Sequence, residues 1–64
     1  METELEFRST SEMMAAIQNA VIEDENANPH NSQLKVIFQG SAYARVDTWT
    51  PFGSVRIHLK VTGG

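Results

Sequence analysis

The spacing of polar and apolar residues changes near residue 9 and separates a predicted strand from a predicted helix. In residues 3–8 (TELEFR), Leu5 and Phe7 alternate with charged side chains, the period-two pattern of a half-buried strand. Ser9 and Glu12 then form a capping box, in which the hydroxyl and the carboxylate each bind a free backbone N–H. Apolar residues at helical spacing follow and predict a helix over residues 10–24. They are Met13, Ala16, Ile17, Ala20 and Val21, with Met14 and Ile22 on one flank.

Three further strands are predicted after a polar loop over residues 25–32. Asn, Pro and Ser cluster in this loop, and Pro29 disfavours helical geometry at the preceding residue. The same loop carries His30, which we expect at an exposed tip. The predicted strands are residues 34–39, 42–50 and 55–62. Counting back from the TPFG turn pairs Trp49 with Ser54, Asp47 with Arg56, Arg45 with His58 and Tyr43 with Lys60, which separates one polar face from one apolar face.

The turn at QGSA leaves two pairings open for the strand before it. A two-residue loop, residues 40–41, pairs Phe38 with Tyr43 and turns the apolar side chains of this strand to the polar face. A three-residue loop, residues 39–41, pairs Phe38 with Ala42 and keeps all strong apolar positions under the helix. Burying three large side chains is worth about 1.5–3 kcal/mol each. This exceeds a turn preference, so we favour the three-residue loop.

Together these elements predict an α+β fold in which one helix packs on a four-stranded, mainly antiparallel sheet. The element order is β-α-β-β-β, and the whole chain, residues 1–64, forms a single small domain with its loop at residues 25–32. The helix returns the chain, so the first strand is expected to run parallel to the second. The neighbour of the first strand stays open, because it could be the second strand or the fourth.

The composition restricts what such a fold can do. A chain of 64 residues buries a small share of its surface, so a domain of this size usually needs a staple or a partner. There is no cysteine, and His30 and His58 lie far apart, so we expect no disulfide, no metal site and no cofactor. Self-association, such as a homodimer, is therefore expected. No stretch resembles a signal peptide or a membrane span, so we expect a soluble, intracellular and cytoplasmic protein.

Charge is distributed unevenly along the chain, although the net charge is only -3. Most acidic residues lie before residue 33, and four of the five basic residues lie after it. On the sheet face opposite the helix, these bases are expected to stand beside two aromatic side chains. The predicted partner-binding residues are Lys35, Tyr43, Arg45, Trp49, Arg56, His58 and Lys60 on this face and Phe52 at the tip of the last turn. Alternatively, Trp49 and Phe52 could pack together and close the end of the sheet.

Two functions fit this pattern, and neither is enzymatic. No catalytic motif is present, so no catalytic residue is assigned. The first function is protein binding, because Trp, Tyr and Arg are the types enriched at binding hot spots and edge strands pair with other chains. The partner would be a second copy or a larger protein. By size alone, the chain is similar to accessory or inhibitory proteins of phages and mobile elements.

The alternative function is binding of single-stranded nucleic acid. Cations on the sheet face would pair with phosphates, and bases would stack on Tyr43 and Trp49. The isoelectric point of about 5.1 counts against this alternative, since nucleic-acid-binding domains usually carry an excess of positive charge.

Overall fold

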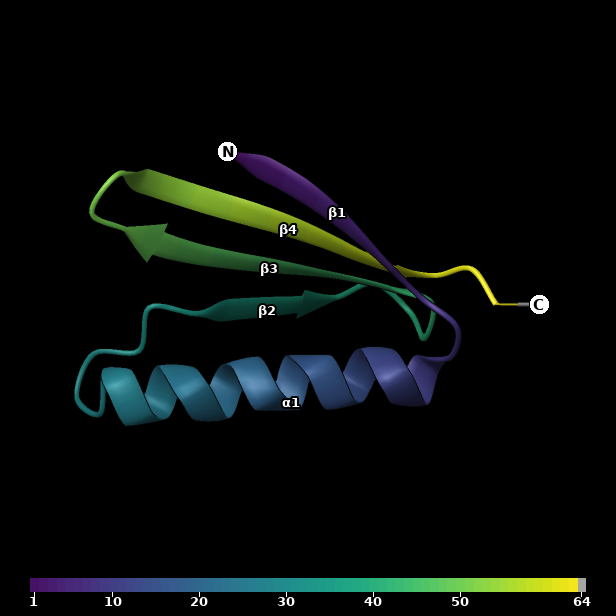
Figure 1. Cartoon of the computed structure of the whole chain (residues 1–64), viewed down its shortest axis with the longest axis horizontal. Coiled ribbons are helices and arrows are strands. Elements are labelled where there is room, and N and C mark those ends of the chain that lie inside the picture. Colours follow the sequence, from purple (N-terminus) through teal and green to yellow (C-terminus); the bar gives the residue numbers. More distant parts are fainter. Residues whose placement is uncertain (64) are drawn as a thin grey trace.

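A computed structural model describes residues 1–63, which form one helix and one four-stranded mixed sheet (Figure 1). The elements are β1 (Glu2–Phe7), α1 (Thr10–Ala27), β2 (Lys35–Phe38), β3 (Tyr43–Thr50) and β4 (Gly53–Val61). The helix packs on one face of the sheet and leaves the other face open. This confirms the predicted α+β class and the β-α-β-β-β order of its elements.

The strand order in the sheet is β1-β4-β3-β2. β3 pairs antiparallel with β2 and with β4, whereas β1 pairs parallel with β4. Two antiparallel steps connect β4 to β2, so β1 and β2 run in the same direction, as predicted. The neighbour of β1, left open by the sequence, is β4. The first and last strands of the chain are therefore adjacent, and β1 and β2 form opposite edges of the sheet.

The pairing of β3 with β4 follows the predicted register, but the turn between them is tighter than expected. Both strands continue to the pair Thr50 and Gly53, so only Pro51 and Phe52 form the turn. Gly53 has a φ of 126°, a conformation that favours glycine. The Thr50 hydroxyl accepts the Phe52 N–H at 3.1 Å and donates to the Gly53 carbonyl at 2.9 Å. These bonds stabilise the turn that presents Phe52.

The hairpin of β2 and β3 confirms which face β2 presents, but the predicted register is wrong by two residues. Phe38 lies opposite Ala44 instead of Ala42. The Gln39 N–H donates to the Tyr43 carbonyl at 3.0 Å, so the three-residue loop comprises residues 40–42 instead of 39–41. A shift of two residues keeps every side chain on its face.

Two local features explain this register. Gly40 has a φ of 85°, so the observed loop begins with the residue that tolerates a left-handed conformation. The observed register also places Lys35 opposite Asp47. The predicted register would have placed Lys35 opposite Arg45, and like charges directly across a strand pair are destabilising.

The helix starts where predicted and ends three residues later. The Ser9 hydroxyl accepts the Glu12 N–H at 3.2 Å, and the Glu12 carboxylate accepts the Arg8 N–H at 3.3 Å. The predicted end at Asp24 is wrong, because α1 continues to Ala27 and Asn28 forms its C-cap. Within residues 1–63, no helix is both long and apolar enough to cross a membrane.

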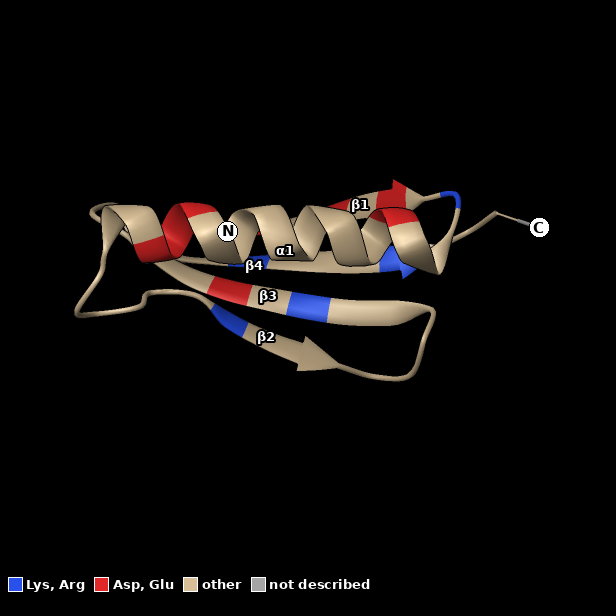
Figure 2. Ribbon diagram, turned by 90° about the horizontal axis from the view of Figure 1, so that it is seen from below, with Lys and Arg blue, Asp and Glu red and all other residues tan. Residues whose placement is uncertain are grey.

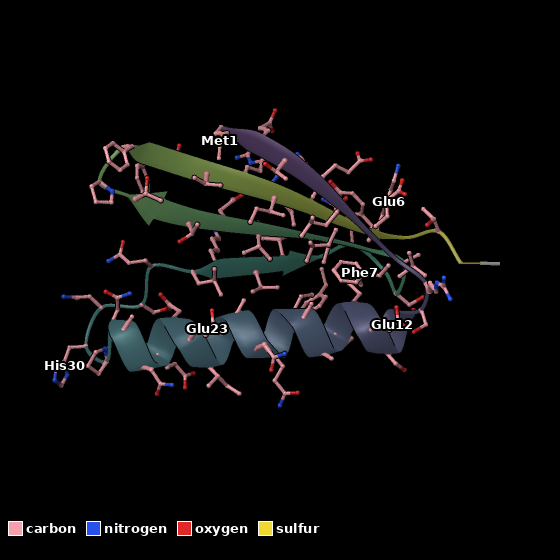
Figure 3. All side chains as sticks on the ribbon, viewed as in Figure 1. Met1, Glu6, Phe7, Glu12, Glu23 and His30 are labelled. Atoms are coloured by element: carbon pink, nitrogen blue, oxygen red, sulfur yellow. The ribbon has the colours of Figure 1, made fainter. Side chains whose placement is uncertain are left out.

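The Asp24 carboxylate explains why the last turn of α1 and the following loop are ordered together. It accepts the Ser32 hydroxyl at 2.6 Å, the Gln33 N–H at 3.2 Å and the Asn28 side-chain amide at 3.2 Å. The bond from Ser32, helped by the other donors, holds the pKa of Asp24 below its usual value. This cluster connects the end of α1 to the start of β2. His30 lies in the loop and is exposed at its tip (Figure 3).

The core lies between α1 and the sheet. Figure 3 shows Phe7 directed from β1 toward the helix and Glu6 directed away from it. Seen from the helix side in Figure 2, α1 overlies β4 and β1, while β2 stands clear of it at the far edge. The buried side chains of the described residues are Met13, Ile17, Ala44, Val46 and Leu59, with Phe7, Val21, Leu34, Val36, Ile57 and Val61 packed around them.

Candidate functional site

The open sheet face, opposite α1, presents its side chains in rows across the four strands. One row is Glu2, Arg56, Asp47 and Lys35, the next is Glu4, His58, Arg45 and Ile37, and the third begins with Glu6, Lys60 and Tyr43. Trp49 follows in the same alternation, opposite Ser54 at the end of the sheet. The structure therefore brings the seven predicted face residues onto one surface, and Figure 2 shows basic and acidic positions on neighbouring strands.

Lys60 is paired with the acidic strand beside it. Its Nζ lies 3.0 Å from Glu4 Oε1 and 3.7 Å from Glu6 Oε1. The hydrogen bond and the negative charge of Glu4 raise the pKa of Lys60 above its usual value. These contacts connect β1 to β4 through side chains as well as through the backbone ladder.

Asp47 pairs with two arginines. Arg56 Nε lies 3.1 Å from Asp47 Oδ1, and Arg45 Nη2 lies 3.4 Å from Asp47 Oδ2. Arg45 Nε is buried and has no hydrogen-bond partner in the described part of the chain. One carboxylate in the middle of the sheet thus forms ion pairs with two of the four bases of this face.

A histidine connects three strands of the open face. The Tyr43 hydroxyl is hydrogen bonded to Nδ1 of His58, and Nε2 of His58 lies 3.2 Å from Glu2 Oε1. A carboxylate only accepts hydrogen bonds, so Nε2 carries the proton and donates to Glu2. The chain from Tyr43 on β3 through His58 on β4 to Glu2 on β1 stabilises the edge strand.

The open face is electrically balanced. Glu2, Glu4, Glu6 and Asp47 supply four negative charges, and four bases stand among them, namely Lys35, Arg45, Arg56 and Lys60. The alternation in the sequence placed the bases, Glu4 and Glu6 on this face, but it left the position of the first strand open and did not include Glu2. The register of β1 against β4 adds Glu2, opposite Arg56, and brings the three acids beside the bases.

The end of the sheet at the β3–β4 turn is apolar and exposed. Phe52 is 100% exposed, Trp49 is 67% exposed and Met1 is 81% exposed. The alternative in which Trp49 and Phe52 pack together to close the sheet end is therefore wrong. A two-residue turn explains this, because it is too short to fold Phe52 back onto the sheet. We call Met1, Trp49 and Phe52 the sheet tip; it lies where the N-terminal end of β1 approaches the turn (Figure 1).

Two open grooves adjoin the sheet tip. One, of about 540 Å³, is lined by Met1 and Trp49 together with Lys35, Asp47 and Arg56 of the open face. The other, of about 570 Å³, is lined by Met1, Pro51, Phe52 and Val55 and is almost entirely apolar. Met1 lines both, so the grooves are neighbours, and sequence reasoning had no signal for its part in them. An apolar groove flanked by a charged one can take a partner side chain of either kind.

In residues 1–63, no group of three or more His, Asp and Glu side chains is arranged to hold a metal ion. No protein-family model, curated protein or solved structure matches the chain.

Proposed function

We propose that the protein is a small non-enzymatic protein-interaction module, an accessory or inhibitory protein of the cytoplasm that binds a larger protein through the sheet tip. One observation carries the proposal: Trp49 and Phe52 are 67% and 100% exposed in a domain in which residues 1–63 contribute five buried apolar side chains. Trp is enriched at binding hot spots, and an exposed apolar cluster is a typical contact surface.

The energetics support a contact at this position. Covering the exposed parts of Trp49 and Phe52 would remove on the order of 300 Å² of apolar surface from water, worth roughly 7 kcal/mol before the costs of association. The charged rows next to Trp49 would form a polar rim around this apolar centre, as in ordinary protein interfaces. The groove beside Trp49 is lined by charges of both signs, Lys35 and Arg56 with Glu2 and Asp47, so it can pair with charged groups of either sign at the partner's rim.

Single-stranded nucleic acid is the weaker candidate for the same face. Its bases would stack on Tyr43 and Trp49, but the ring of Tyr43 already lies against the ring of His58, with the ring centroids 6.1 Å apart and the planes tilted by 41°. The phosphates would also have to displace carboxylates from Lys60, Arg45 and Arg56. The balanced charge therefore supports a protein partner more than a polyanion.

Affinity capture with matched variants tests the proposal. We expect proteins retained by the wild-type chain to be lost with Trp49→Ala or Phe52→Ala, each weakening binding at least about tenfold. Met14→Ala, which truncates another exposed apolar side chain on α1, is the control and should retain them. Far-UV circular dichroism and thermal unfolding should show all three variants folded. Retention of the same proteins by the Trp49/Phe52 double variant would contradict the proposal.

A further inference from the structure

The two edges of the sheet differ in their capacity to pair with another chain. β1 presents Glu2, Glu4 and Glu6 along its open-face side. Antiparallel pairing of β1 with its own copy would place Glu4 opposite Glu4, which is destabilising. β2 carries no acidic residue, and its helix-side positions are the apolar Val36 and Phe38. Charged edge residues protect a strand against pairing, so β2 is the less protected edge.

The residues that carry these apolar side chains, Val36 and Phe38, also have backbone N–H and C=O groups that point away from β3. The Gln39 N–H donates to the Tyr43 carbonyl at 3.0 Å, so Gln39 belongs to a hydrogen-bonded pair with β3. In an antiparallel ladder such pairs alternate along the strand. Ile37 and Lys35 therefore also bond to β3, and the N–H and C=O groups of Val36 and Phe38 point away from the sheet. They are free to bond to a further strand.

Neither the helix nor the loop covers this edge. α1 overlies β4 and β1, and β2 is the outermost strand on the other side (Figure 2). Phe38 remains 51% exposed, and Leu34 and Val36 are only half-buried although they pack against the core. An added strand would thus extend the apolar face as well as the ladder.

We propose that β2 is the dimer interface of this protein, and that its partner is β2 of a second copy, paired antiparallel about a two-fold axis at Val36. In this register Val36 lies opposite Val36 of the second copy, and Leu34 lies opposite its Phe38. The backbone groups of Val36 point outward in both copies, so the central pair is hydrogen bonded. The result is a closed, isologous dimer with an eight-stranded sheet and both helices on the same side.

Neighbouring registers are less favourable. A shift by two residues in one direction places Lys35 directly opposite Lys35 of the second copy, where like charges repel. A shift in the other direction places Leu34 opposite Gly40, which lies in the loop with a φ of 85° and cannot extend the ladder. The register centred on Val36 instead places Lys35 opposite Ile37, whose apolar side chain accommodates the lysine stem.

Single cysteine variants test this register directly, because the chain has no cysteine and any disulfide must join two copies. Cα atoms of a hydrogen-bonded pair lie about 5.5 Å apart, within the range of disulfides. We expect Val36→Cys to cross-link under mild oxidation at least about ten times faster than Phe38→Cys. The two copies of Phe38 lie about 13 Å apart along the strands in this register. Leu5→Cys, on the β1 edge, is the second control.

The comparison is decisive because Phe38 and Leu5 are exposed, at 51% and 45%, whereas Val36 is half-buried. Cross-linking by random collision would therefore favour both controls over Val36→Cys. Such an order of rates, or no cross-linking of Val36→Cys, would overturn the proposal. The conservative change from Val to Cys keeps the core contact, so the test does not depend on a disruptive variant.

Light scattering at increasing concentration gives an independent measurement. The interface is short, so we expect the mass of the wild-type protein to rise from that of the 7.1 kDa chain to twice that value across the micromolar range. Val36→Lys should remain monomeric at every concentration, and Leu5→Lys should dimerise like the wild type. Trp49→Ala should also dimerise normally, so loss of the dimer and loss of the larger partner are separate results. A wild-type protein that remains monomeric at millimolar concentration would overturn the proposal.

Discussion

The two faces of the sheet are formed by alternate residues of the same strands, yet they depend on different physical effects. On the helix side, Leu59 and its neighbours are held by burial, which is insensitive to salt and is lost only with the fold. On the open side, Lys60 and its neighbours are held by ion pairs that water and salt screen. Stability is therefore expected to come from one face, and the recognition properties of the surface from the other.

The largest expected effect follows from truncating the apolar face. Leu59→Ala removes a side chain that is 4% exposed at the centre of the core, and such changes usually cost 2–5 kcal/mol. In a domain of this size the variant should be largely unfolded at 37 °C, as measured by urea or thermal unfolding followed by circular dichroism. Tyr43→Phe, on the opposite face of the neighbouring strand, removes one hydroxyl contact and should cost about 1 kcal/mol. Equal losses in the two variants would contradict this division between the faces.

The next effect concerns the charge of the open face. Replacing Glu2, Glu4 and Glu6 together by Gln leaves Asp47 as the remaining acid among the four bases of that face. We expect this triple variant to bind labelled single-stranded RNA or DNA at low salt, with binding lost as salt is raised. Fluorescence anisotropy measures binding at low and at raised salt. At low salt, the wild-type chain should bind at least about tenfold more weakly than the triple variant. Comparable binding by both proteins would mean that β1 does not neutralise the basic rows.

The smallest effect is expected on the pH dependence of stability. It comes from the hydrogen bonds of Asp24 at the end of α1. The pKa of Asp24 is lowered in the folded protein, so its hydrogen bonds stabilise the fold above the ordinary carboxyl pKa of about 4. This contribution is lost as the pH falls through the lowered value, when the carboxylate takes up a proton. Urea unfolding at neutral pH and near pH 3 should show a smaller acid destabilisation for Asp24→Asn than for the wild type. An identical acid destabilisation would exclude this role.

The pattern of the sequence was sufficient for the element order, the polarity of each face and the β3–β4 register. Strict alternation from Tyr43 to Thr50 and from Val55 to Val61 admits one pairing across a tight turn. The β2–β3 register was not among the pairings considered, but it could have been found, because it places Lys35 opposite Asp47 whereas the predicted register places Lys35 opposite Arg45. Weighing cross-strand charge as well as apolar burial would have selected it.

Other features depend on the assembled molecule. The position of β1 beside β4 follows from packing of α1 across both strands, and no local pattern specifies it. The exposure of Trp49 and Phe52 depends on where the strands end, which is the least reliable part of a pattern-based prediction. The extension of α1 beyond Asp24 depends on donors from Ser32 and Gln33 across the loop. The first two of these features determine the open face and the sheet tip.

The adjacency of β1 and β4 has a consequence for biosynthesis. β4 is the last strand in the chain but an inner strand of the sheet, with β1 on one side and β3 on the other. Until β4 has left the ribosome, β1 has no strand to pair with, and the nascent chain holds a helix, a hairpin and an unpaired acidic strand. Pairing across most of the chain length also slows folding. We therefore expect the domain to fold only once β4 has been made, in a single step, with the glutamates of β1 keeping the waiting strand soluble.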